Sequence, residues 1–136
     1  MRIASAILVA IIGLMAVMLA PQYAQVTRVI DGDTIEVRSL TGATARVRYI
    51  GIDTPEMDEA GGPEAKAANE KLVGGAWIKM QSDVSDKDVY GRLLRYVYTD
   101  GIMVNAQLIR LGHAKAVRYE PDTSNARTFE NIERGR

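Results

Sequence analysis

The distribution of hydrophobic residues divides the chain near residue 24 into an apolar leader and a segment of short alternating runs. Residues 4–20 are continuously apolar and follow Arg2, which is the pattern of a secretory signal peptide. An uncleaved membrane anchor is the alternative. Cleavage after Ala20 or Ala24 fits the pattern, although neither position has a small residue at −3.

We expect residues 1–24 to be a signal peptide or an N-terminal anchor, and residues 25–136 to form one domain with a modest core. The protein would then be secreted or periplasmic, or held at a membrane by its uncleaved leader. The chain contains no cysteine, so no disulfide would stabilise the domain outside the cytoplasm.

The alternating segment predicts five strands and two or three helices. The strands are expected at 25–31, 34–40, 44–52, 77–84 and 90–99, and the helices at 63–73, 103–112 and 125–134. The last helix is expected to be short, with Phe129 and Ile132 as its only large apolar anchors, and therefore marginal without packing. Five strands with helices between and after them are typical of a mainly β α+β fold built on an OB-type barrel.

Charge composition narrows the function classes. The 17 basic and 17 acidic residues balance, so the chain lacks the basic excess of a general nucleic-acid-binding protein. Any such binding must come from local charge. Most of the basic residues are arginine, which favours bidentate contacts with carboxylate or phosphate.

Acidic residues gather at two strand ends. Asp31-Gly32 is a turn signal, but a turn does not explain why Asp33 follows it. Asp53, Thr54 and Glu56 come where the third strand should end. If the strands pair as a meander, Asp33 lies beside Asp53, and two such carboxylates with further oxygen ligands would suit Ca²⁺. The alternative is an ordinary polar exit from a strand.

Two arginines lie in otherwise apolar strands. Arg48 is expected to be half-buried near the rim of the barrel, where a guanidinium needs a carboxylate or a bound anion. Arg92 follows Tyr90-Gly91 at the expected start of the last strand, on the same face as Leu94. Each arginine taken alone is compatible with a structural role.

Five stretches taken together resemble the staphylococcal nuclease (thermonuclease) family. They are VIDGDTIEV, RYIGIDTPE, GPEA, DVYGRLLRYVY and GIMVNAQLIRLGHA, in the order of the family, over about residues 25–120. Each motif is weak alone, but the ordered combination is specific. The resemblance implies a five-stranded OB-type barrel with three helices, and calcium-dependent hydrolysis of DNA and RNA that leaves 3′-phosphates.

The same resemblance assigns roles to individual residues. The calcium carboxylates fall on Asp33 and Asp53, and a ligating backbone carbonyl falls on Thr54. The proposed general base falls on Glu56. Phosphate-binding arginines fall on Arg48 and Arg92, and pocket tyrosines on Tyr90 and Tyr119. Arginine is a poor proton donor because its pKa is above ~12, so the acid that protonates the leaving group stays unassigned. The only histidine, His113, has no predicted place at the site.

The chain also departs from the best-known relatives, mostly by losing positive charge. The loop between Glu56 and Pro63 is short and acidic, Val89 stands where a lysine is found in such a relative, and one pocket tyrosine is lost near Tyr119. Because affinity for nucleic acid depends on phosphate contacts, we expect weaker binding than in a basic relative.

Three functional interpretations follow. The first is a monomeric Ca²⁺-dependent nuclease acting on single-stranded DNA and RNA, with no protein partner. The second is an OB-fold nucleic-acid-binding module without catalysis. The third is a truncated remnant without function. The acids and arginines that inactive members usually lose are all present, which favours the enzyme; they are Asp33, Arg48, Asp53, Glu56 and Arg92.

Overall fold

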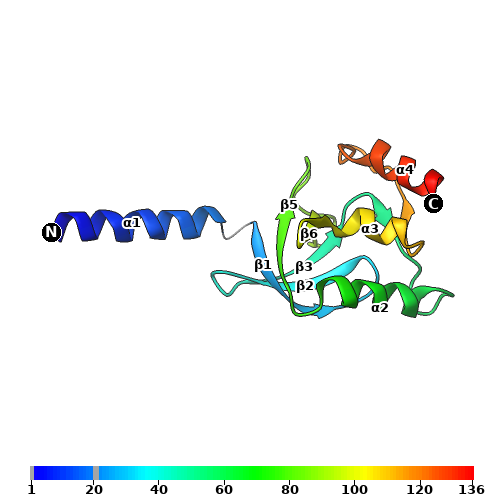
Figure 1. The fold of residues 1–136 in the computed structure, drawn as a ribbon, viewed down its shortest axis with the longest axis horizontal. Helices are drawn as coiled ribbons and strands as arrows, with labels where there is room; N and C mark the ends of the chain where they lie inside the picture. Colours follow the sequence, from blue (N-terminus) through cyan, green and yellow to red (C-terminus); the bar gives the residue numbers. More distant parts are fainter. Residues whose placement is uncertain (1, 20–21) are drawn as a thin grey trace.

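The computed structural model describes residues 2–19 and 22–136. Its centre is a barrel of five strands, β1 (Tyr23–Val29), β2 (Thr34–Ser39), β3 (Thr44–Tyr49), β5 (Trp77–Gln81) and β6 (Leu93–Thr99). The strands pair in the order β3-β2-β1-β5-β6, and a parallel pairing of β3 with β6 closes the barrel (Figure 1). This arrangement confirms the predicted α+β fold with an OB-type barrel.

Short strands and three helices complete the domain. β4 (Ile52–Asp53) pairs with β8 (Lys115–Ala116), and β7 (Ile102–Met103) extends the sheet beyond β6. The helices α2 (Gly62–Val73), α3 (Val104–Arg110) and α4 (Ala126–Gly135) lie beside the barrel (Figure 1). All three predicted helices are therefore present, with ends within a few residues of those expected.

The inward side chains of the strands and helices form one hydrophobic core. Its fully buried large members include Ile35, Val37, Val47, Ile78, Val97, Leu108 and Ile109. The short α4 joins this core through Phe129, which is 1% exposed and packs edge-on against Tyr96. Gly51 makes room for that ring, because a Cβ there would lie 2.8 Å from it. Packing thus supplies the support that α4 lacks by itself.

The structure shortens three predicted strands. The predicted fourth strand ends at Gln81 rather than at residue 84. The third strand ends at Tyr49 rather than at residue 52, because Gly51 has a positive φ of 78° and turns the chain before β4. Alternation along one strand therefore does not relate the side chain of Arg48 to those of Ile50 and Ile52. The last barrel strand begins at Leu93, so Arg92 lies in the preceding loop and does not follow the alternation of the strand.

The leader forms α1 (Arg2–Leu19), and the side chains of residues 2–15 are exposed. They therefore contribute nothing to the core of the barrel. Among the residues that the structure describes, no helix has both the length and the apolar character needed to cross a bilayer. The signal peptide and the anchor remain predictions.

The first barrel strand begins two residues before the expected domain boundary at residue 25. Ala24 is 0% exposed and pairs with Ser39 on β2 and Ile78 on β5. A fragment beginning at residue 25 should therefore be less stable than one beginning at residue 22, by about 1–3 kcal/mol in urea unfolding, because strand hydrogen bonds and a buried methyl group are lost.

The control for this comparison is Tyr23→Ala in the longer fragment, since Tyr23 is 37% exposed and its replacement leaves the backbone pairing in place. We expect that variant to stay close to its parent. Equal stability of the two fragments would show that the start of β1 is dispensable.

Candidate active site

The site begins at the bend between β1 and β2, which is shaped by a close contact. A Cβ on Gly32 would lie 2.7 Å from both the Cβ of Ala65 on α2 and the Oγ1 of Thr54. Glycine is needed here for this contact and not for a left-handed φ, which it does not adopt. The Asp33 N–H donates to Oδ1 of Asp31 at 3.0 Å and fixes the bend.

Asp33 is a buried carboxylate, 6% exposed, with donors on both oxygens. The backbone N–H of Thr54 donates to its Oδ2 at 3.0 Å, and the Thr34 hydroxyl donates to its Oδ1 at 3.1 Å. Arg48 Nη2 lies 3.2 Å from the same Oδ2. Hydrogen bonds and an ion pair therefore compensate for the burial of this charge.

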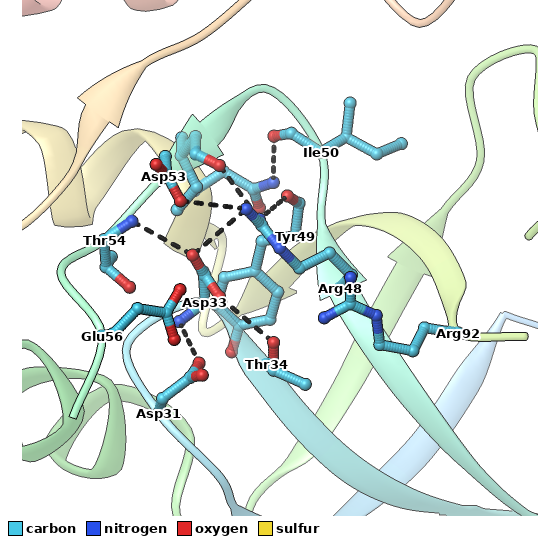
Figure 2. Close-up of polar contacts among 12 residues, drawn as sticks. Asp31, Asp33, Thr34, Arg48, Tyr49, Ile50, Asp53, Thr54, Glu56 and Arg92 are labelled. Atoms are coloured by element: carbon cyan, nitrogen blue, oxygen red, sulfur yellow. Dashed lines mark hydrogen bonds and ion pairs between the residues drawn. The ribbon is translucent and has the colours of Figure 1, made fainter. Parts of the chain in front are cut away.

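Arg48 connects the two acidic strand ends. Its Nη1 donates to the carbonyls of Tyr49 and Ile52 at 2.8 and 2.9 Å, which fixes the turn between β3 and β4. Its Nη2 lies 3.2 Å from Asp33 and 3.3 Å from Asp53 (Figure 2). The predicted neighbourhood of Asp33 and Asp53 is thus present, with one guanidinium nitrogen between them.

Negative charge exceeds positive charge around this guanidinium. Figure 2 shows Asp31 and Glu56 on the side of Asp33 that faces away from Arg48. Burial raises the pKa of the Asp31 carboxyl to about 6, and the charges of Asp33 and Glu56 add to the shift. A raised carboxyl pKa is the expected result when carboxylates gather without enough cations.

This donor set fits a hard divalent cation in its chemistry. Asp33 and Asp53 offer carboxylate oxygens and Thr54 a backbone carbonyl, and a cation would relieve the excess negative charge. Within residues 2–19 and 22–136, no three His, Cys, Asp or Glu side chains are grouped closely enough to hold a metal by themselves. A cation here would therefore need the Thr54 carbonyl and water in addition to the two aspartates.

A buried polar chain fixes the bend from below. The Tyr49 hydroxyl donates to Asn69 Oδ1 at 2.8 Å, and Asn69 Nδ2 donates to the Asp31 carbonyl at 2.9 Å. Burial raises the pKa of Tyr49 strongly, so the phenol stays protonated as a donor. Through these bonds α2 determines where Asp31 and Asp33 lie.

The second arginine is held in the loop before β6. Asp88 Oδ1 accepts the backbone N–H groups of Tyr90 and Arg92, and its Oδ2 accepts Arg92 Nε at 2.7 Å. Burial raises the pKa of Asp88, but the hydrogen bonds from Arg92 and Tyr90 outweigh it and leave the pKa lowered. The Arg92 guanidinium lies 5.4 Å from the centre of the Tyr90 ring.

A groove of about 500 Å³ joins this loop to Arg48. Arg48, Arg92, Tyr90 and Tyr119 all line it, and Figure 2 shows Arg92 directed toward Arg48. Tyr90 is 80% exposed and Tyr119 57% exposed, so both rings are available to a ligand. Two guanidinium groups beside two open aromatic rings form a surface suited to a phosphate attached to a base.

The structure therefore groups the predicted residues into two adjoining sets. Asp33, Asp53 and Thr54 lie on one side of Arg48, and Arg92, Tyr90 and Tyr119 lie along the groove on its other side. Glu56 is exposed at the edge of the acidic set, with its backbone N–H bonded to Glu59 Oε1.

Sequence reasoning missed four residues that position or surround this site. The sequence indicates Asp31 only as part of a turn, and it assigns no role to Asp88. Asn69 is a polar residue of α2 that is fully buried. A buried polar residue indicates a structural or functional role, but the sequence alone does not show which face of the helix is buried. His113, for which the sequence predicted no place at the site, lines one pocket with Asp53 and Thr54.

The barrel has the topology of an OB-type fold, with a carboxylate–arginine cluster at the end of β3 and an aromatic groove beside it. The model of the family described as staphylococcal nuclease homologue matches residues 46–135. The chain belongs to that family, which confirms the resemblance found in the sequence.

Individual relatives agree with this assignment. The chain is 40% identical over 114 residues to the SPbeta prophage-derived endonuclease YokF of Bacillus subtilis, across 78% of this chain and 38% of that protein. It is 40% identical over 103 residues to the thermonuclease of Staphylococcus intermedius, across 71% and 61%. For the thermonuclease of Staphylococcus hyicus the identity is 36% over 116 residues, across 81% and 68%. The chain thus spans less than two thirds of the length of most of these relatives.

Proposed function

We propose that this chain is a calcium-dependent nuclease that hydrolyses phosphodiester bonds of single-stranded DNA and RNA and leaves 3′-phosphates. The observation that carries the proposal is the position of Arg48, which contacts both acidic strand ends and also lines the aromatic groove. A phosphate bound at Arg48 would have carboxylates on one side and stacking rings on the other. Family membership supports the same reaction class.

The groove would bind the nucleotide. Tyr90 and Tyr119 offer exposed ring faces to a base, and stacking of this kind tolerates any sequence. Arg92 is already oriented by Asp88, so little conformational freedom is lost when it meets a phosphate. Together Arg48 and Arg92 would stabilise the negative charge that develops on the phosphoryl oxygens.

Asp33, Asp53 and the Thr54 carbonyl would hold the calcium ion. When bound, calcium supplies positive charge next to the phosphate and polarises its oxygens. The residues of the chain do the rest of the positioning: Thr54 and Thr34 keep Asp33 oriented through hydrogen bonds at 3.0 and 3.1 Å.

Glu56 would act as the general base. It is the exposed carboxylate at the edge of the acidic set, where a water molecule can reach it, and its oxygens would accept the proton of the attacking water. A guanidinium is a poor proton donor to the leaving oxygen, so the role of Arg92 would be charge stabilisation.

The test is metal removal. Labelled single-stranded DNA and RNA should be cleaved in Ca²⁺, and chelation should reduce cleavage at least about a hundredfold, with recovery when calcium is restored. Products should carry 5′-hydroxyls, so a polynucleotide kinase should label them without prior phosphatase treatment. A protein that folds by circular dichroism and binds the strand but never cuts it would instead be a binding module.

For the leader, we propose that residues 1–24 direct export, which would place the domain outside the cytoplasm, or else anchor it to a membrane. The run of exposed apolar side chains on α1 supports a role apart from the barrel. Sequencing the N-terminus of the protein recovered from the medium, periplasm and membrane fractions would distinguish the two. We propose a monomer, to be checked by light scattering.

A further inference from the structure

A second polar pocket lies on the other side of the acidic residues from the groove. It has a volume of about 400 Å³ and is formed by the segment after β4 and the segment after α3. Asp53, Thr54 and Glu59 line it from the first segment, and His113 and Lys115 from the second. The groove and this pocket have no lining residue in common, and the Arg48–Asp53 contact lies between them.

Lys115 is placed in this pocket by strand pairing. β4 and β8 are antiparallel with Asp53 opposite Lys115, so the two side chains leave the same face of the ladder. The Asp53 carboxylate is nevertheless directed to Arg48, at 3.3 Å. In the part of the chain that the structure describes, no ion pair engages Lys115 or His113.

Two further acids of this region accept backbone N–H groups. Glu59 Oε1 accepts the N–H of Glu56 at 2.9 Å, and Glu133 Oε2 accepts the N–H of Ala116 at 2.8 Å. Arg136 adds a second cation to the pocket while donating to the carbonyls of Ile109 and Ala114. The pocket thus offers an unpaired ammonium, a guanidinium and an imidazole beside the proposed cleavage point.

We infer that this pocket is a second phosphate subsite, which binds the backbone phosphate next to the scissile one. This inference rests on the proposed function. A single strand would run from the Tyr90–Tyr119 groove across Arg48 and Asp53 into the pocket, where Lys115 contacts its next phosphate. The affinity of the site for a substrate would then depend on strand length and on the phosphates on both sides of the bond that is cut.

Equilibrium binding tests the subsite without cleavage. In full-length Glu56→Gln protein, Lys115→Ala should weaken binding of a fluorescent single-stranded DNA uniformly across sequences. The slope of log K against log salt should become shallower by about 0.7, the value for one lost phosphate contact on a single strand. Lys79→Ala, which removes an exposed lysine from a pocket separate from both, should leave the slope unchanged.

Kinetics with substrates of two lengths provide the second test. For an oligonucleotide, Lys115→Ala should raise KM about tenfold, as expected when one charged contact is lost. For a nucleoside nitrophenyl phosphodiester, which carries only the scissile phosphate, KM and kcat should not change.

The outcomes separate the subsite from the proposed function. An unchanged salt slope, or equal effects on both substrates, would overturn the subsite while cleavage by the parent protein still supports the nuclease. Absence of cleavage by the parent would overturn the nuclease, and the salt slope would still decide whether Lys115 contacts a phosphate.

Discussion

Arg48→Ala should lower cleavage of single-stranded DNA by about 10²–10³-fold, with kcat carrying most of the loss. The reason is its position: Arg48 lines the groove and lies 3.2–3.3 Å from Asp33 and Asp53, so it would contact the phosphate where charge develops. Initial rates at saturating substrate and calcium measure the effect.

The same substitution should destabilise the metal-free protein by about 3 kcal/mol, because Asp33 stays buried and loses its only arginine partner among the described residues. Calcium offers a replacement charge. It should therefore raise the melting temperature of Arg48→Ala more than that of the parent. This difference distinguishes a metal site at Asp33 and Asp53 from an arginine that merely supports the fold.

Arg46→Ala is the matched control for both measurements. Arg46 lies two residues away on β3, but its side chain is 59% exposed and forms an ion pair with Glu36 at the surface. Its loss should change activity less than about twofold and stability by less than about 1 kcal/mol. Similar effects of the two substitutions would remove Arg48 from the proposed mechanism.

Glu56→Gln should reduce cleavage about 10²–10⁴-fold while leaving folding and strand binding intact. The amide keeps the size of the side chain but cannot accept the proton of the attacking water. Since Glu56 is exposed at the edge of the site, its replacement leaves no buried group without a partner. Cleavage rates, circular dichroism and binding anisotropy on the same samples separate these effects.

Asp58→Asn provides the control within the same loop. Asp58 is exposed and lines neither the groove nor the proposed phosphate pocket. We expect little change in rate. Undiminished cleavage by Glu56→Gln would assign the base to another carboxylate, and Asp31 is the nearest alternative on the same side of Asp33.

Sequence patterns predicted the local parts of this site well. The pattern predicted Asp33 just before β2, where its backbone begins to pair with β3, and it predicted Asp53 and Thr54 at the exit from the third strand. It placed Arg48 inside a longer third strand, whereas Arg48 lies one residue before the end of β3. Predictions weakened where one residue changes the geometry. Gly51 turns the chain and ends β3 early, and Asp88 holds Arg92 in a loop before β6. The strands predicted from the alternating pattern were therefore too long at both places.

The remaining residues depend on contacts between distant segments. Asn69 joins the site through α2, and His113 and Lys115 through the pairing of β8 with β4. Hydrophobic periodicity does not predict such contacts, because they depend on how helices and strands pack against one another in the folded barrel. A lone histidine after a helix therefore gave no signal before the fold was known.

The parallel pairing of β3 with β6 makes the site depend on global topology. Arg48 is paired with Leu94 across that seam, so the two arginines meet only when strands some 46 residues apart come together. Such non-local pairings form late and slowly. The carboxylates and Arg48 can assemble within the β1–β3 meander, but the groove cannot. An incompletely folded chain would thus carry the acids and Arg48 without the aromatic groove beside them.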